Sequence, residues 1–108
     1  MIEQDIQSLI MIEISKLGGI PIRLNSGKAW GGVMSNGVII HPRAIKLCPE
    51  GTPDILAILP NGRVAWVECK TAKGRQRESQ KRFQIMLEKL GHKYYLLRTP
   101  KDVHLIFE

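Results

Sequence analysis

The spacing of apolar residues predicts two long helices. From residue 2 to residue 17, apolar side chains recur every three or four positions, and Gly18 follows as a typical helix stop. The expected buried stripe of this helix consists of Ile2, Ile6, Leu9, Ile10, Ile14 and Leu17. Residues 76–90 show the same period before Gly91. The stripe of this second helix consists of Phe83, Met86, Leu87 and Leu90.

Shorter apolar runs predict strands. They cover residues 20–24, 55–59, 63–69 and 93–97. Asn36-Gly37 separates two further runs, 30–34 and 38–41, and an Asn-Gly pair favours a tight turn. We therefore expect a projecting β-hairpin arm at 29–41, followed by an irregular connection over 42–50.

The order of these elements predicts the fold class. Thr99, Pro100 and Asp102 form a capping pattern that opens a short last helix. Helices and strands that alternate in this way are typical of an α/β sandwich, with a mixed central sheet flanked by helices. The whole chain, residues 1–108, is expected to form one domain.

The hairpin at 54–70 has charged residues at its ends, and its register decides whether they meet. A two-residue loop, Asn61-Gly62, would pair Asp54 with Cys69. A three-residue loop over 60–62, with Gly62 in the left-handed conformation, places Asp54 opposite Glu68 instead. Lys70 then lies on the same face, because side chains alternate along a strand. We prefer the second register, in which two facing carboxylates need a cation between them.

The charge balance favours a polyanionic partner. The chain has 16 Lys and Arg against 10 Asp and Glu, a formal net charge of +6, which favours nucleic acid over an acidic membrane surface. Candidate DNA contacts from polar loops and the arm are Arg23, Asn25, Ser26, Lys28, Arg43, Lys46, Lys73 and Arg75. The polar loop at 25–28 is equally explained as a simple turn.

Other sequence features exclude several classes of protein. Two cysteines, Cys48 and Cys69, are too few for a disulfide scaffold, and neither has a zinc-ligand spacing. No stretch approaches the roughly 20 apolar residues of a membrane helix, and acidic residues interrupt any signal-peptide pattern. We therefore expect a cytoplasmic, or at least intracellular, protein without membrane contact.

The charged ends of the hairpin suit metal-dependent phosphodiester cleavage. Asp54 and Glu68 supply the hard oxygen ligands that Mg²⁺ or Mn²⁺ prefers, with the backbone carbonyl of Cys69 between them. Lys70 would orient a water molecule or stabilise charge on phosphorus. Glu3 lies at the edge of the first buried stripe, and Gln80 points toward the sheet from the second helix. A favourable helix dipole also explains Glu3, and a structural hydrogen bond also explains Gln80.

These residues together resemble the VRR-NUC family of the PD-(D/E)XK nuclease superfamily, including its small standalone members. The resemblance rests on Gly51-Thr52-Pro53-Asp54, Glu68-Cys69-Lys70, Gly74-Arg75 and Gln80. It implies a restriction-endonuclease-like fold, with Asp54, Glu68 and Lys70 as the superfamily's catalytic residues. It further implies that Gln80 is the family's helical glutamine and that Glu3 completes the metal site.

The resemblance also implies an activity. It predicts a Mg²⁺- or Mn²⁺-dependent endonuclease without a small-molecule cofactor, acting as a homodimer on branched DNA such as Holliday junctions. A phage-encoded member would act in the host cytoplasm. The alternative is a non-catalytic nucleic-acid-binding module on the same fold. Against it, a pure binder gains nothing from carboxylates that face phosphates.

Overall fold

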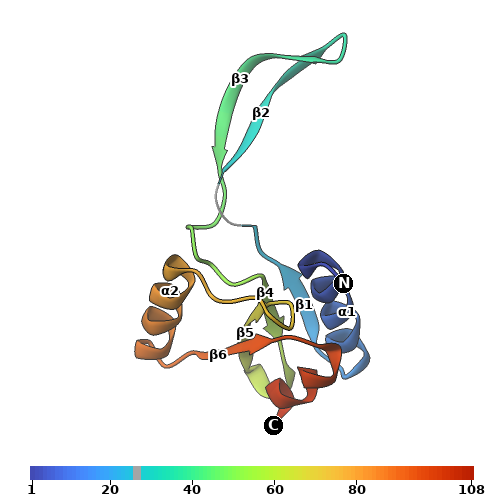
Figure 1. Cartoon of the computed structure of the whole chain (residues 1–108), viewed down its shortest axis with the longest axis vertical. Helices are drawn as coiled ribbons and strands as arrows, with labels where there is room; N and C mark the ends of the chain where they lie inside the picture. The colour runs from blue at the N-terminus through green and yellow to red at the C-terminus, as the bar shows by residue number, and fades with distance from the viewer. Residues whose placement is uncertain (26–27) are drawn as a thin grey trace.

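The computed structural model describes residues 1–25 and 28–108, with backbone only for residues 28–35 and 39–46 (Figure 1). Its elements, in chain order, are α1 (Glu3–Lys16), β1 (Ile20–Arg23), β2 (Lys28–Ser35), β3 (Val38–Lys46), β4 (Ile55–Ile58), η1 (Pro60–Gly62), β5 (Val64–Cys69), α2 (Glu78–Lys89), β6 (Lys93–Leu97) and η2 (Pro100–Phe107). No helix within the described ranges is long and apolar enough to span a bilayer.

A mixed four-stranded sheet forms the centre of the body. Its strand order is β1-β4-β5-β6; β4 runs antiparallel to both of its neighbours, and β5 and β6 are parallel. The parallel pair requires a crossover, which α2 supplies. Helices α1 and α2 lie on opposite sides of this sheet, and the β2–β3 arm projects away from it (Figure 1). The predicted α/β fold with a mixed sheet and an arm is confirmed.

The main core lies between α1, η2 and one face of the sheet. Ile6, Ile10 and Ile14 of α1 pack against alternate residues of β4 and β5, including Ile55 and Val67. The predicted stripe of α1 is wrong at its margins, because Ile2, Leu9 and Leu17 are exposed. The stripe of α2 is wrong at Met86 and Leu90, which are 55% and 77% exposed. Helix α2 contacts mainly β6 at the edge of the sheet, so the covered face of the helix is narrower than the predicted stripe.

The turn between β4 and β5 sets the register that the sequence favoured. Ile55 pairs with Val67 and Ile58 with Val64, so Asp54 faces Glu68 by extension. The intervening loop is η1, with Gly62 in the left-handed region at φ +72°. Asn61 shares that conformation at φ +64°, which asparagine tolerates better than most residues.

The arm is longer than predicted. Residues 42–46 continue β3 and pair with β2, so the expected irregular connection is wrong over this stretch. Arg43 pairs with Gly31 but Ile40 pairs with Val33, which leaves a bulge around Pro42. A proline fits within a strand at such a bulge because no ladder hydrogen bond is required of it there.

Candidate active site

Three carboxylates from different elements meet at one end of the sheet. Glu3 lies in the first turn of α1, Asp54 directly precedes β4, and Glu68 lies near the end of β5. Each offers one carboxylate oxygen, and these atoms lie within 4.8 Å of one another. Because β4 and β5 are antiparallel, the start of one strand lies beside the end of the other. The register therefore brings together residues that are 14 positions apart in the sequence.

Backbone hydrogen bonds fix the position of Asp54. The N–H of Cys69 donates to Asp54 Oδ2 at 2.7 Å, across the two strands. The N–H of Leu24 donates to the Asp54 carbonyl oxygen at 2.8 Å, and so links β1 to the same residue. The aspartate is thus held from both neighbouring strands and has its second carboxylate oxygen left for another partner.

The residues before Asp54 allow α2 to approach the site. Gly51 has φ +90°, and a β-carbon there would collide with the backbone carbonyl of Ser79 at the start of α2. Thr52 is buried, and its hydroxyl donates to the carbonyl of Pro49. Glycine is required at residue 51 both by its backbone conformation and by this contact. The Gly-Thr-Pro-Asp motif therefore positions Asp54 and α2 together.

Glu68 is fully buried, and Gln80 of α2 binds it. Gln80 Nε2 donates to Glu68 Oε2 at 3.1 Å, while Gln80 Oε1 accepts from the backbone N–H of Arg77 at 2.8 Å. This second bond fixes which end of the amide faces Glu68. The pKa of the Glu68 carboxyl is raised to about 9, chiefly by burial and then by the neighbouring Asp54, while Lys70 acts in the opposite direction. The Gln80 side chain therefore points toward the sheet, as predicted, and both ends of its amide form hydrogen bonds.

Lys70 lies on the same side of the hairpin as the carboxylates. Its side chain is almost fully buried, and Nζ lies 4.0 Å from Glu3 Oε1. Its backbone N–H donates to the carbonyl of Leu97 in β6 at 3.0 Å. Arg98, the next residue of that segment, donates through Nη1 to the carbonyls of Thr71 at 2.6 Å and Gly74 at 2.7 Å. The loop that follows the lysine is therefore tied to the end of β6.

The donor set suits a hard divalent cation. Three carboxylates close together, one of them buried, repel one another unless they bind a cation or a proton. Glu68 retains a proton near neutral pH, chiefly because it is buried and secondly because Asp54 lies beside it, and a divalent ion would favour its ionised form instead. The Cys69 thiol is buried in the core, and burial raises its pKa, so only the backbone carbonyl of this residue suits the ion. The residues present fit Mg²⁺ or Mn²⁺.

An open cleft of about 420 Å³ adjoins the carboxylates. Glu3 and Asp54 line it, together with Arg23 and Asn25 of the predicted DNA contacts. Gln4 and Gln7 of α1 also line the cleft, with Leu24 and Leu47.

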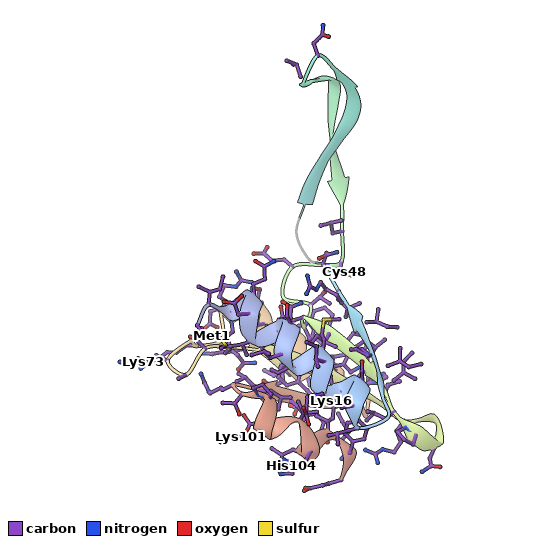
Figure 2. The ribbon with its side chains drawn as sticks, turned by 90° about the vertical axis from the view of Figure 1, so that its right-hand side faces the viewer. Met1, Lys16, Cys48, Lys73, Lys101 and His104 are labelled. Atoms are coloured by element: carbon purple, nitrogen blue, oxygen red, sulfur yellow. The ribbon has the colours of Figure 1, made fainter. Side chains whose placement is uncertain are left out.

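The remaining predicted DNA contacts lie on two further segments. Lys73 and Arg75 are exposed on the loop after β5, from which Lys73 points away from the body (Figure 2). Lys28 and Lys46 pair near the base of the arm, close to Cys48, and Arg43 lies further along it, all three described by their backbone alone. Ser26 lies outside the described residues.

Sequence reasoning missed three residues near the site. Tyr94 of β6 approaches Glu68, Gln76 binds Tyr94, and Arg98 ties the loop after Lys70. Strands β5 and β6 are parallel, so their carboxyl ends share one edge of the sheet. A parallel pairing of 64–69 with 93–97, had it been inferred, would have indicated Arg98 as a neighbour of Lys70.

Comparison with known proteins gives one fold relationship. No family model matches the sequence, and no curated protein matches it. A solved structure described as a VRR_NUC domain is similar, with a TM-score of 0.65 and 22% sequence identity; the match covers 96% of this chain and 91% of that chain. The alignment spans nearly all of both chains, so the similarity is not confined to the sheet. This chain therefore has the fold of a VRR_NUC domain, as its sequence motifs implied.

Proposed function

We propose that this protein is a divalent-metal-dependent DNA endonuclease of the VRR-NUC family that hydrolyses phosphodiester bonds in branched DNA. The observation that carries the proposal is the meeting of Glu3, Asp54 and Glu68, with oxygen atoms within 4.8 Å, beside the buried Lys70. A binding surface for phosphates does not require three carboxylates, because they repel the DNA backbone. A metal-dependent hydrolytic site does use such carboxylates, because they hold the cation that offsets their repulsion of the DNA backbone.

Each residue of the site has a proposed role. Glu3, Asp54, Glu68 and the carbonyl of Cys69 would hold Mg²⁺ or Mn²⁺. When bound, such an ion would polarise the phosphate and acidify a water molecule. Lys70, with Nζ 4.0 Å from Glu3, would donate a hydrogen bond to the attacking water or to a phosphate oxygen. Gln80 would hold Glu68 through the bond of 3.1 Å to Oε2.

The surroundings of the site supply the proposed contacts to DNA. Arg23 and Asn25 line the cleft that opens at Asp54, and Lys73 and Arg75 are exposed on the neighbouring loop. The net charge of +6 would draw the polyanion toward this acidic centre. Lys28, Arg43 and Lys46 would extend the contact along the arm, and Ser26, outside the described residues, stays a predicted contact.

Branched DNA and a homodimer complete the proposal. The resemblance to small standalone VRR-NUC members supports both. The physical reason is symmetry: resolution of a four-way junction needs two matched incisions, and one copy of this chain offers one carboxylate cluster among its described residues. Two copies related by a twofold axis would present two such sites to the two strands.

A substrate panel tests the activity. Labelled four-way junction, flap, fork, linear duplex and single strand are incubated with the protein in Mg²⁺, Mn²⁺ or EDTA at one ionic strength, and the mass in solution is measured in parallel. We expect cleavage of the junction in either metal, none in EDTA, and the mass of a dimer. A monomer that cuts the junction would refute the homodimer alone.

Variants separate cleavage from binding. Asp54→Asn and Lys70→Ala should each reduce the cleavage rate by about 100-fold or more and leave junction binding in place. Glu13→Gln and Lys16→Ala, which remove the same kinds of charge far along α1, should cut like the wild type. Cleavage retained in Asp54→Asn would refute the assigned site. Tight binding with no metal-dependent product on any substrate would favour the non-catalytic binding module.

A further inference from the structure

Glu68 has a hydrogen-bond donor near each of its carboxylate oxygens. Gln80 donates to Oε2, as described above, and the Tyr94 hydroxyl lies 3.5 Å from Oε1. Tyr94 pairs with Trp66 in the parallel register of β5 and β6. Glu68 lies two residues beyond Trp66, so the tyrosine and the glutamate share one face of the sheet. The proposed chemistry makes no use of this tyrosine.

The hydrogen bonds around Tyr94 have a definite direction. Gln76 Nε2 donates to the Tyr94 hydroxyl at 2.7 Å and to Gln84 Oε1 at 2.9 Å, so both of its amide protons are used. A tyrosine hydroxyl ordinarily keeps its proton near neutral pH. Its oxygen accepts from Gln76, which leaves the proton for Glu68 Oε1. Gln76 therefore donates a hydrogen bond to Tyr94, and Tyr94 donates one to Glu68.

We propose that Tyr94 and Gln76 are positioning residues that hold the Glu68 carboxylate in the orientation that binds the metal. This inference rests on the proposed function of the acidic cluster. A carboxylate with one donor on each oxygen, from β6 and from α2, cannot rotate without breaking a bond. The carboxyl group held in this way has an oxygen within 4.8 Å of oxygens of Asp54 and Glu3. Hydrogen bonds of this kind, made to metal ligands rather than to the metal, typically affect metal affinity by 10- to 100-fold.

Both hydrogen-bond paths to Glu68 begin in one short segment. Gln76 begins the path through Tyr94, and the backbone N–H of Arg77 begins the path through Gln80. This segment joins the basic loop that carries Arg75 to the first turn of α2. The Gln76 side chain bonds Tyr94 and Gln84 but not Gln80 or Glu68, so a substitution at Gln76 is a second test of the path through Tyr94.

Metal affinity measured without DNA tests the inference. The full chain is titrated with Mn²⁺ at pH 7.5, followed by the electron paramagnetic resonance signal of the free ion. We expect Tyr94→Phe to raise the Kd for Mn²⁺ by about 10-fold and Gln76→Ala to raise it by a smaller factor. Tyr95→Phe is the matched control, because Tyr95 packs against the core on the other face of β6; its Kd should equal that of the wild type.

A second readout distinguishes positioning from simple packing. In cleavage assays, Tyr94→Phe should need more metal for half-maximal rate, and saturating metal should restore most of the wild-type kcat. A purely structural role would lower the thermal midpoint and leave the metal requirement unchanged. If Tyr94→Phe does not fold, Gln76→Ala, on the connecting segment, carries the test.

The possible results separate the two proposals. An unchanged Mn²⁺ affinity in a folded Tyr94→Phe protein, or in Gln76→Ala, would overturn this inference, even if the wild type cleaves DNA. A wild type that binds Mn²⁺ more tightly than Tyr94→Phe, yet cuts no DNA, would overturn the proposed nuclease and support the inference. A wild type with no Mn²⁺ binding at all would overturn both.

Discussion

Replacing Glu68 by glutamine should stabilise the metal-free protein. The carboxyl is fully buried, and its pKa is raised to about 9, chiefly by burial and then by Asp54. The folded protein must therefore keep a proton on Glu68 that the unfolded chain has already released. A glutamine amide can carry its own N–H toward Asp54, as the protonated acid does, and can still accept a bond from Gln80. Its nitrogen cannot accept from Tyr94, and the loss of that contact of 3.5 Å has the same cost at every pH. Glu68→Gln thus removes the cost of taking up the proton.

The size and sign of the effect follow from the two pKa values. Below the unfolded value of 4.5 both states are protonated, and Glu68 costs nothing. Between 4.5 and about 9 only the folded state binds the proton, so stability falls as the pH rises, by about 1.4 kcal/mol per pH unit. The stability of the variant relative to the wild type should therefore rise by roughly 3 kcal/mol between pH 5.5 and pH 7.5.

Urea unfolding in EDTA between pH 5.5 and 8.5 measures this difference. The exposed Glu50 gives the control, because Glu50→Gln removes a surface carboxylate and should leave the pH dependence of the wild type unchanged. Added Mg²⁺ should stabilise the wild type at pH 7.5 far more than Glu68→Gln, since the variant lacks a ligand. A stability difference between variant and wild type that does not change with pH would refute the reasoning.

Three further variants test the frame of the site and its proposed DNA contacts. Gly51→Ala should lower the free energy of unfolding by about 2–4 kcal/mol, measured in urea, because its β-carbon meets the backbone of α2; unchanged stability would contradict that contact. Arg98→Met should cost about 2 kcal/mol and expose the loop 71–74 to limited proteolysis, because its carbonyl bonds are lost. If the loop 71–74 is cut no faster in Arg98→Met than in the wild type, the bonds from Arg98 do not hold this loop in place. Lys73→Ala with Arg75→Ala should weaken DNA binding and flatten its dependence on salt, read from binding isotherms at several ionic strengths; an unaltered slope would exclude these two contacts.

The sequence predicted the parts of the site that depend on local rules. A turn of three residues with Gly62 at its end fixes the pairing of β4 with β5, and that pairing alone places Asp54 opposite Glu68. Helical period gave the inward direction of Gln80, because its position relative to Leu87 is set by the helix. The prediction of burial was wrong at the margins of both apolar stripes. The helical period shows which side of a helix faces inward, but it does not show how wide the covered face is.

The rest of the site depends on which distant segments become neighbours. Tyr94 and Arg98 acquire their partners only because β6 lies parallel to β5, and nothing within residues 93–98 specifies that neighbour. The extension of β3 through residue 46 has a similar cause. Proline argues against a strand when each residue is considered alone, whereas a bulge against the partner strand makes it acceptable.

The place of Glu3 has a practical consequence for handling the protein. Glu3 is in the first turn of α1, and Met1 and Ile2 before it are 80% and 63% exposed. Any peptide fused ahead of Met1 therefore emerges within two residues of the carboxylates. A polyhistidine tag there would bring competing imidazoles to the cluster and distort every metal titration. Glu108 ends the chain at the opposite end of the molecule from the arm (Figure 1), so a purification handle is better attached there.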